Sequence, residues 1–333
     1  MRFFRYTILL FALVLWGGGL SSTISHWLYE IGFIADDYRF GDLYRLSALP
    51  QFKMAQPDCA PSHRSSDTAS TQLYLIGDSF TEPQRLSESD FQVSLFQRVA
   101  WYNQQRIQLN PDKRNVLIIE TVERHFREHL AIPIIEFIVE KDTTQLGQTK
   151  PSLRKRISDD LHRTDIEERL ESTLFSQNWA FWFKELKASL TLNWFNRTNS
   201  KVSLSKDKQN LFLKMDTDTT QKLLSSFSEL SDQEVNTLVD SVNAVASRYR
   251  QLGFDEVYLS IIPNKASILE TNRSDYNHLI ERVQNNPKLV VPYIDTYDLF
   301  KRATPSPYLK SDTHWNCEGR AIWLEQIRQK VRI

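Results

Sequence analysis

The chain has 333 residues, of which 25% are charged and 41% hydrophobic, which is enough for one large domain or two small ones. Lysine plus arginine and aspartate plus glutamate both number 41, so no net charge draws the protein to nucleic acid or to an anionic surface. Only 9 glycines occur, and neither GxGxxG nor GxxxxGK[ST] is present, so we expect no nucleotide cofactor.

The first 28 residues predict a targeting segment. Arg2 and Arg5 precede an uncharged apolar run over residues 6–20, the order that sends the following chain out of the cytoplasm. A bilayer span needs about 20 residues, and residues 19–21 resemble a small-residue cleavage site, so a cleaved signal peptide is one reading. Because the apolar character continues to Leu28, we favour an uncleaved inner-membrane anchor. Both readings place the remaining chain on the periplasmic side or secrete it.

Residues 29–71 predict a juxtamembrane segment and a linker, the latter polar and containing Pro57 and Pro61. Cys59 lies in this linker and Cys317 lies near the C-terminus. An exported chain permits a disulfide between them, with two buried free thiols as the alternative. No CxxC pair or histidine cluster accompanies either cysteine, so we expect no metal site.

From residue 72 onward the chain alternates strands and helices. Apolar runs predict strands at 73–76, 115–119, 256–262 and 288–294, and apolar periodicity predicts helices at 231–249 and 276–284. Ser231 and Glu234 suit a capping box at the first helix, and Gly253 suits its end. The alternation predicts an α/β domain over 72–333, built on a parallel sheet with helices on both faces.

Residues at about 150–220 interrupt this alternation and predict a mainly helical insertion. The insertion carries a group of aromatic residues, namely Trp179, Phe181, Trp182, Phe183, Trp194 and Phe195. Ordinary helix packing is the favoured interpretation of such a group. A lid or docking surface is the alternative.

Polar residues follow the predicted strands directly. Ser79 comes after the first strand, Glu120 and Arg124 after the second, and Asn264 and Lys265 after the third. In a parallel sheet, ligands bind beyond the carboxyl ends of the strands. We therefore expect these residues to share one rim.

The residues Gly77-Asp78-Ser79 and Asp312-Thr313-His314 predict a nucleophilic triad. Ser79 lies on a strand-to-helix turn, where its hydroxyl is exposed and backbone N–H groups can face an oxyanion. A serine needs a histidine to remove its proton and a carboxylate to orient that histidine. Residues two apart in an extended segment project to the same side, so Asp312 can reach the ring of His314.

These strings resemble the SGNH hydrolase superfamily. The run LIGDSF at 75–80 is similar to its first block, and DTHWN at 312–316 with the following Gly319 is similar to its closing block. The DTHWN form resembles the alginate O-acetyltransferase group, of the AlgJ and AlgX type. IE at 119–120 with Arg124, and PNK at 263–265, are similar to two further strings of that group.

The resemblance covers about residues 72–126 and 254–325 and implies a three-layer SGNH fold. It implies O-acetylation of an exported polysaccharide without a cofactor, with a membrane-bound O-acyltransferase as the partner that delivers the acyl group. Because the serine precedes the histidine motif, as in ordinary SGNH esterases, a carbohydrate esterase or deacetylase is the first alternative. A non-catalytic glycan-binding or scaffold subunit is the second.

The remaining site candidates surround the triad. The superfamily's oxyanion-hole glycine and asparagine are not recognisable, so Arg124 and Asn264 are candidates for the missing donor. The further substrate-binding candidates are Asp78, Glu120, Lys265 and Trp315.

Overall fold

The computed structural model describes residues 2–20, 43, 46, 49–54, 59, 69–83, 85–140, 178–195, 197–198 and 201–333. The chain divides into two compact units. One comprises residues 1–56 and 149–199, and the other comprises residues 57–148 and 200–333. The predicted boundary at residue 71 therefore falls inside the second unit, and most of the predicted insertion falls in the first.

The helices of the first unit are α1 (Arg2–Leu20) and α7 (Asn178–Asn193). The strands of the second unit are β1 (Thr71–Gly77), β2 (Leu95–Ala100), β3 (Gln105–Ile107), β4 (Arg114–Val122), β5 (Phe137–Val139), β6 (Val202–Leu204), β7 (Leu211–Leu213), β8 (Glu256–Ile262) and β9 (Tyr293–Ile294). Its helices are η1 (Ser79–Thr81), η2 (Glu88–Asp90), α4 (Glu123–His129), α8 (Lys214–Thr217), α9 (Asp232–Gln251), α10 (Lys265–Leu269), α11 (Leu279–Gln284), α12 (Tyr297–Arg302) and α13 (Cys317–Val331).

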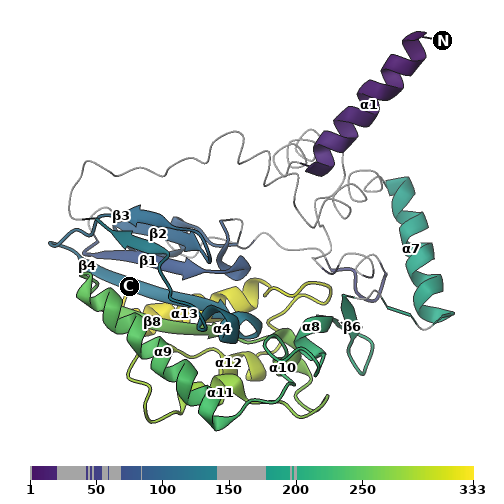
Figure 1. The fold of residues 1–333 in the computed structure, drawn as a ribbon. Helices are drawn as coiled ribbons and strands as arrows, with labels where there is room; N and C mark the ends of the chain where they lie inside the picture. The colour runs from purple at the N-terminus through teal and green to yellow at the C-terminus, as the bar shows by residue number, and fades with distance from the viewer. Residues whose placement is uncertain are drawn as a thin grey trace. The chain divides into compact units, whose positions relative to one another are not determined.

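The second unit is an α/β structure around a five-stranded sheet in the order β2-β1-β4-β8-β9 (Figure 1). Every neighbouring pair in this sheet is parallel. The prediction of a parallel α/β sheet is confirmed. Because β1 and β4 are adjacent, the residues that follow them emerge at the same edge.

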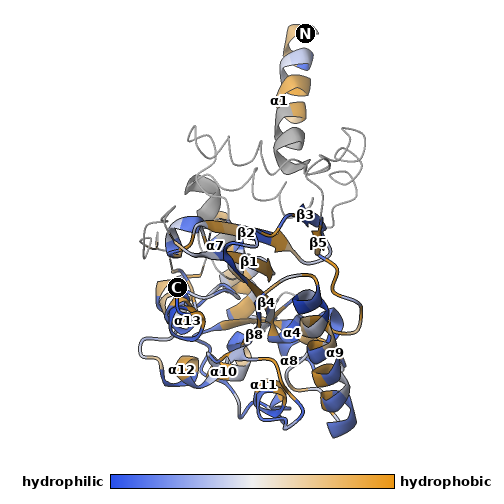
Figure 2. Ribbon diagram, turned by 90° about the vertical axis from the view of Figure 1, so that its left-hand side faces the viewer, coloured by the Kyte–Doolittle hydropathy of each residue, from blue (hydrophilic) through white to orange (hydrophobic). Residues whose placement is uncertain are grey.

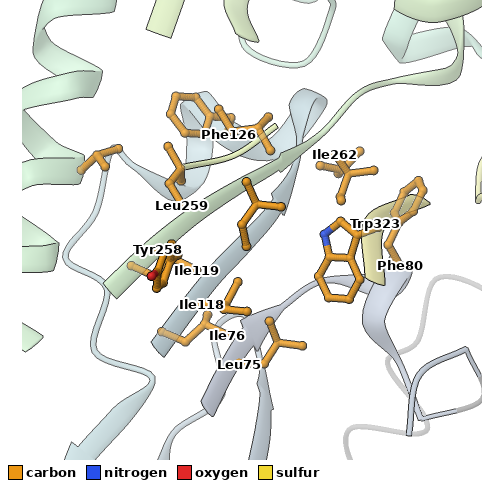
Figure 3. Packing of buried hydrophobic residues seen from close by; sticks show 14 of the residues in the cluster. Leu75, Ile76, Phe80, Ile118, Ile119, Phe126, Tyr258, Leu259, Ile262 and Trp323 are labelled. Atoms are coloured by element: carbon orange, nitrogen blue, oxygen red, sulfur yellow. The ribbon is translucent and has the colours of Figure 1, made fainter. Parts of the chain in front are cut away.

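Helices cover both faces of the sheet, and strand β8 shows why its sequence is mostly apolar. The Tyr258 hydroxyl donates to the carbonyl of Lys330 at 3.2 Å, and Trp323 Nε1 donates to Ser260 Oγ at 2.9 Å, so these alternate positions face α13. Leu259 is buried on the other face. In Figure 2, α13 and α9 lie on opposite sides of the sheet. Figure 3 shows the side chains that pack around the strands in this core.

Helix α9 begins and ends where the sequence predicts. The Ser231 side chain accepts a hydrogen bond from the Glu234 N–H at 3.2 Å. The Glu234 carboxylate binds Arg127 Nε at 2.6 Å, so the structure uses it to tie α9 to α4. Beyond the helix, Gly253 has a φ of +111°, a conformation that favours glycine.

Among the differences from the sequence predictions, those at β2, at β9 and at the hairpin β6–β7 have a physical explanation or bear on the site. Strand β2 was not predicted, because it is an edge strand whose residues are mostly half-buried and form no apolar run. Strand β9 is only two residues long, where a strand over 288–294 was predicted. Residues 202–213 of the predicted helical insertion form the antiparallel hairpin β6–β7. Residues 150–177 of that insertion lie outside the described residues.

Among the residues that the structure describes, no helix is both long enough and apolar enough to cross a membrane, so the predicted N-terminal anchor finds no support.

The aromatic group of the predicted insertion, on α7 and just after it, is exposed where it is described. The side chains of Trp182, Phe183, Trp194 and Phe195 are each at least half exposed. Ordinary helix packing, the favoured interpretation, does not account for these four side chains. The side chains of Trp179 and Phe181 lie outside the described part of the chain.

Candidate active site

Ser79 lies on a sharp turn at the carboxyl end of β1. Asp78 caps the short helix η1 by accepting a hydrogen bond from the Phe80 N–H at 3.0 Å. A Cβ atom on Gly77 would meet Thr81 Oγ1 at 2.1 Å, so the strand end accepts only glycine without rearrangement. The Ser79 N–H makes no hydrogen bond to another described residue. The turn itself thus uses neither the N–H nor the hydroxyl of Ser79, and the residue is half-buried.

His314 and Asp312 complete the arrangement that the sequence predicts. His314 Nε2 lies 2.8 Å from Ser79 Oγ, and His314 Nδ1 lies 2.6 Å from Asp312 Oδ1. Asp312 Oδ1 also accepts the backbone N–H of His314 at 2.8 Å, which fixes the carboxylate against the ring. The three side chains therefore form a continuous Ser–His–Asp chain of hydrogen bonds.

The charge of Asp312 sets the tautomer of His314. Burial alone would raise the pKa of Asp312, but the charge of His314 and two hydrogen bonds from that residue outweigh burial, and the pKa lies well below its usual range. An ionised carboxylate only accepts hydrogen bonds. The His314 Nδ1 atom therefore carries a proton, which leaves Nε2 as the acceptor for the Ser79 hydroxyl proton.

Arg85 adds a positive charge beside the triad that no sequence pattern indicated. Its Nη2 atom lies 3.2 Å from His314 Nδ1, and its Nη1 atom lies 3.4 Å from the Ser79 carbonyl and 3.3 Å from Glu82 Oε2. Because Nδ1 already donates to Asp312, the guanidinium acts on this pair through its charge, which lowers the pKa of Asp312. The Arg85 carbonyl in turn accepts a hydrogen bond from Arg320 Nε at 2.9 Å.

Asp78 and Glu120 belong to the turn rather than to a substrate surface. Asp78 Oδ2 accepts the Val122 N–H at 2.6 Å. Glu120 is fully buried, and its Oε2 atom accepts hydrogen bonds from the Asp78 N–H and from Thr81 Oγ1, both at 3.0 Å. Both carboxyl groups thus brace the nucleophile turn, and Glu120 has no exposed surface to offer a substrate. For the half-buried Asp78, contact with the substrate stays a prediction.

Asn264 and Arg124, the candidates for an oxyanion donor, are buried and paired. Asn264 Nδ2 donates to Ser226 Oγ at 2.7 Å, and its Oδ1 atom accepts from Arg124 Nη1 at 3.4 Å. Arg124 lies 3.6 Å from Asp216 and 6.0 Å from the centre of the Phe80 ring. Because Asn264 is fully buried and its amide donates to Ser226, the structure does not present it to an oxyanion. Arg124 contacts the nucleophile turn through this approach to the Phe80 ring.

Lys265 and Trp315 are also buried beside the candidate active site. Lys265 is 2% exposed, and its Nζ atom donates to the carbonyls of Leu309, Lys310 and Asp312, the last two at 2.8 and 3.4 Å. It holds the segment that carries His314 and does not face substrate. Trp315 is 4% exposed and packs edge-on against Phe80, at 5.2 Å between ring centres.

The predicted disulfide between Cys59 and Cys317 is present. Cys317 is the first residue of α13 and follows His314 by three positions. The bridge thereby ties the linker to the start of the helix that ends the histidine loop. Within the described part of the chain, no group of three or more histidine, cysteine or acidic side chains is placed to hold a metal ion.

Arg98 and Thr81 are further residues of the site that sequence reasoning missed. Arg98 Nη2 donates to the carbonyls of Gly77 and Asp78, at 3.0 and 2.6 Å, and its Nε atom donates to Thr81 Oγ1 at 3.2 Å. Arg98 comes from β2, the strand that the sequence did not reveal. The only signal that could have pointed to Arg98 is the expectation that β1 pairs with a parallel strand on each side.

Comparison of the chain with protein-family models, with curated proteins and with solved structures finds no match. The resemblance to SGNH enzymes therefore rests on the residues named above.

Proposed function

We propose that this protein is an exported serine-dependent O-acyltransferase of the SGNH type, which acylates a polysaccharide through an acyl-serine intermediate. The observation that carries the proposal is the hydrogen-bonded chain from Ser79 Oγ through His314 to Asp312. The proposed three-layer SGNH fold is supported by the parallel sheet, with Ser79 at the carboxyl end of β1. The disulfide supports export, since such bonds persist in oxidising compartments.

The first half-reaction forms the acyl-serine. Ser79 Oγ attacks the acyl carbonyl while His314 Nε2 takes the hydroxyl proton, and Asp312 stabilises the resulting imidazolium. The Ser79 N–H, which makes no hydrogen bond to another described residue, is the proposed donor to the oxyanion of the tetrahedral intermediate. When the intermediate collapses, the bond to the leaving group breaks, and His314 passes its proton to that group.

The second half-reaction transfers the acyl group. A sugar hydroxyl attacks the acyl-serine carbonyl while His314 takes its proton, and the proton then returns to Ser79 Oγ as the ester leaves. A membrane-bound O-acyltransferase is the proposed partner that supplies the acyl donor. If water attacks instead, the same residues make a carbohydrate esterase, an alternative favoured by the chain order of serine before histidine.

Labelling with a fluorophosphonate tests the chemistry of Ser79. We expect the wild-type protein to be labelled at this residue and Ser79→Ala to be unlabelled, because the phosphonate reacts only with an activated serine. Ser247→Ala is the matched control, since Ser247 is exposed on α9, and it should label like the wild type. An unlabelled wild-type protein would favour the non-catalytic glycan-binding or scaffold alternative.

Acyl transfer is tested with an acetyl ester donor, with and without an oligosaccharide acceptor. The proposal expects acetylated oligosaccharide to form and hydrolysis to fall as acceptor is added. Hydrolysis that is unaffected by acceptor would make the protein an esterase.

A further inference from the structure

Glu120 is a buried carboxyl group whose contacts surround the nucleophile but never touch it. Its Oε2 atom accepts the Asp78 N–H and the Thr81 hydroxyl, so it holds the residues on both sides of Ser79. A Cβ atom on Gly77 would lie 2.8 Å from this oxygen, so nothing larger than glycine fits beside it. The backbone of Glu120 is fixed as well, since its carbonyl accepts Trp101 Nε1 at 2.8 Å.

The Asp78 side chain in turn contacts β4, the strand that carries Glu120. Its carboxylate accepts the Val122 N–H at 2.6 Å, two residues beyond Glu120. Each of the two carboxyl groups therefore accepts a backbone N–H from the segment that carries the other, and both lie at the end of β4. The remaining oxygen of Glu120, Oε1, is buried and has no hydrogen-bond partner among the described residues. A carboxyl oxygen in that position is satisfied when it carries a proton and donates it to a neighbouring carboxylate.

The charged groups around Glu120 and Asp78 favour a single negative charge on these two carboxyl groups, not two. Arg98 donates to the Gly77 and Asp78 carbonyls, while Arg85 contacts the Ser79 carbonyl and is paired with Glu82. Two charged carboxylates beside one another, one of them fully buried, repel strongly. Burial, and then the charge of Asp78, raises the pKa of Glu120 well above its usual value. Glu82 beyond η1 and the histidines of α4, His125 and His129, are the other titratable groups near the pair. Burial lowers the pKa of both histidines, to about 3 for His129, so neither adds a positive charge at neutral pH.

We propose that Glu120 and Asp78 share one proton, with Glu120 as the neutral acid, and that this acid–carboxylate pair is the positioning device that fixes the Ser79 turn. The inference deepens the proposed function and rests on it. Glu120 Oε1–H donates to the Asp78 carboxylate, while Oε2 keeps the two hydrogen bonds that it accepts. Loss of the proton at high pH places two negative charges at the turn and releases Ser79 from its position.

Glu120→Gln and Glu120→Asp separate this pair from an ordinary ionised glutamate. A glutamine reproduces the neutral acid, since its oxygen accepts and its NH₂ donates, so fluorophosphonate labelling at pH 7 should change by less than about threefold. Aspartate is one methylene shorter and cannot reach the turn, so labelling should fall on the order of 100-fold. Wild-type labelling should decline at alkaline pH, and this decline should be absent from Glu120→Gln.

The result that overturns the inference is a Glu120→Gln variant that labels at least tenfold slower than wild type at pH 7, or that does not fold. A wild type that does not label at all would instead refute the proposed function. A second measurement does not depend on activity. The infrared carbonyl band of a protonated carboxyl group should be present in the wild type at pH 7 and reduced in Glu120→Gln. Identical bands in the two proteins would refute the shared proton.

Discussion

At the scale of single residues, the site depends on which groups are charged. Asp312 is buried at 1% exposure, yet it is ionised because the ring and the backbone N–H of His314 both donate to it. Glu120 is equally buried, but burial and the charge of the neighbouring Asp78 raise its pKa. Two carboxyl groups of the same site are therefore driven in opposite directions, one to the charged form and one to the neutral form.

Asp312→Asn tests the orientation of the histidine. The asparagine side chain keeps the shape of the carboxylate, but its NH₂ group can donate to Nδ1 and so favours the wrong tautomer of His314. Acyl transfer, or hydrolysis if the protein is an esterase, should fall by about 10⁴ in kcat.

The control for this variant is Asp298→Asn, which changes an exposed aspartate of α12 in the same way. It should leave kcat unchanged. An Asp312→Asn protein that keeps full activity would remove Asp312 from the mechanism.

At the scale of secondary structure, helix α10, strand β7 and the Pro263 carbonyl hold the segment that carries the histidine. Lys265 of α10 donates to three of its carbonyls, and the Leu211 N–H of β7 donates to the Lys310 carbonyl at 2.9 Å. Tyr308 forms a β-bridge with Trp315, and its hydroxyl donates to the Pro263 carbonyl at 2.5 Å. The hairpin β6–β7, predicted as part of a helical insertion, is thus a support for the candidate active site.

Lys265→Met tests this support. Methionine fills the space of the lysine stem but donates to none of the carbonyls, and each buried group left unpaired costs about 1–3 kcal/mol. The free energy of unfolding, measured with urea, should fall by at least that amount. Fluorophosphonate labelling of Ser79 should slow as well, because the segment carries His314.

Lys288→Met is the control, since Lys288 is exposed. It should match the wild type in both measurements. A Lys265→Met protein with wild-type stability and labelling would show that the hydrogen bonds from the Lys265 ammonium group do not support the segment that carries His314.

At the scale of the whole molecule, the disulfide joins residues 258 positions apart. It connects the segment before β1 with the start of α13, whose Trp323 is fully buried against β8. The bond constrains the unfolded chain over most of its length, which stabilises the fold by a loop-closure effect.

The variant Cys59→Ser/Cys317→Ser tests this effect. Its free energy of unfolding should be lower than that of the oxidised wild type by about 2–5 kcal/mol. Addition of reductant should destabilise the wild type to the same degree and leave the variant unchanged. Two thiols that alkylate without reductant in the native wild type would contradict the bond.

The sequence by itself determined the strands β1, β4 and β8, the helix α9 and the three triad residues. Each of these has a local signature: a buried parallel strand is an apolar run, a capped helix has Ser231 at its start, and Asp312 lies two residues from His314. Such signals depend only on neighbours along the chain.

Tertiary structure alone decided the roles of the other polar residues. Arg85 and Arg98 reach the site from segments without a pattern, and Glu120 and Asn264, which the sequence placed at the rim, proved to be buried. Position after a strand predicts which end of the sheet a residue occupies, but not whether its side chain turns toward solvent or toward the core. Contacts such as Lys265 to the Asp312 carbonyl decide that, and they join residues far apart in the sequence.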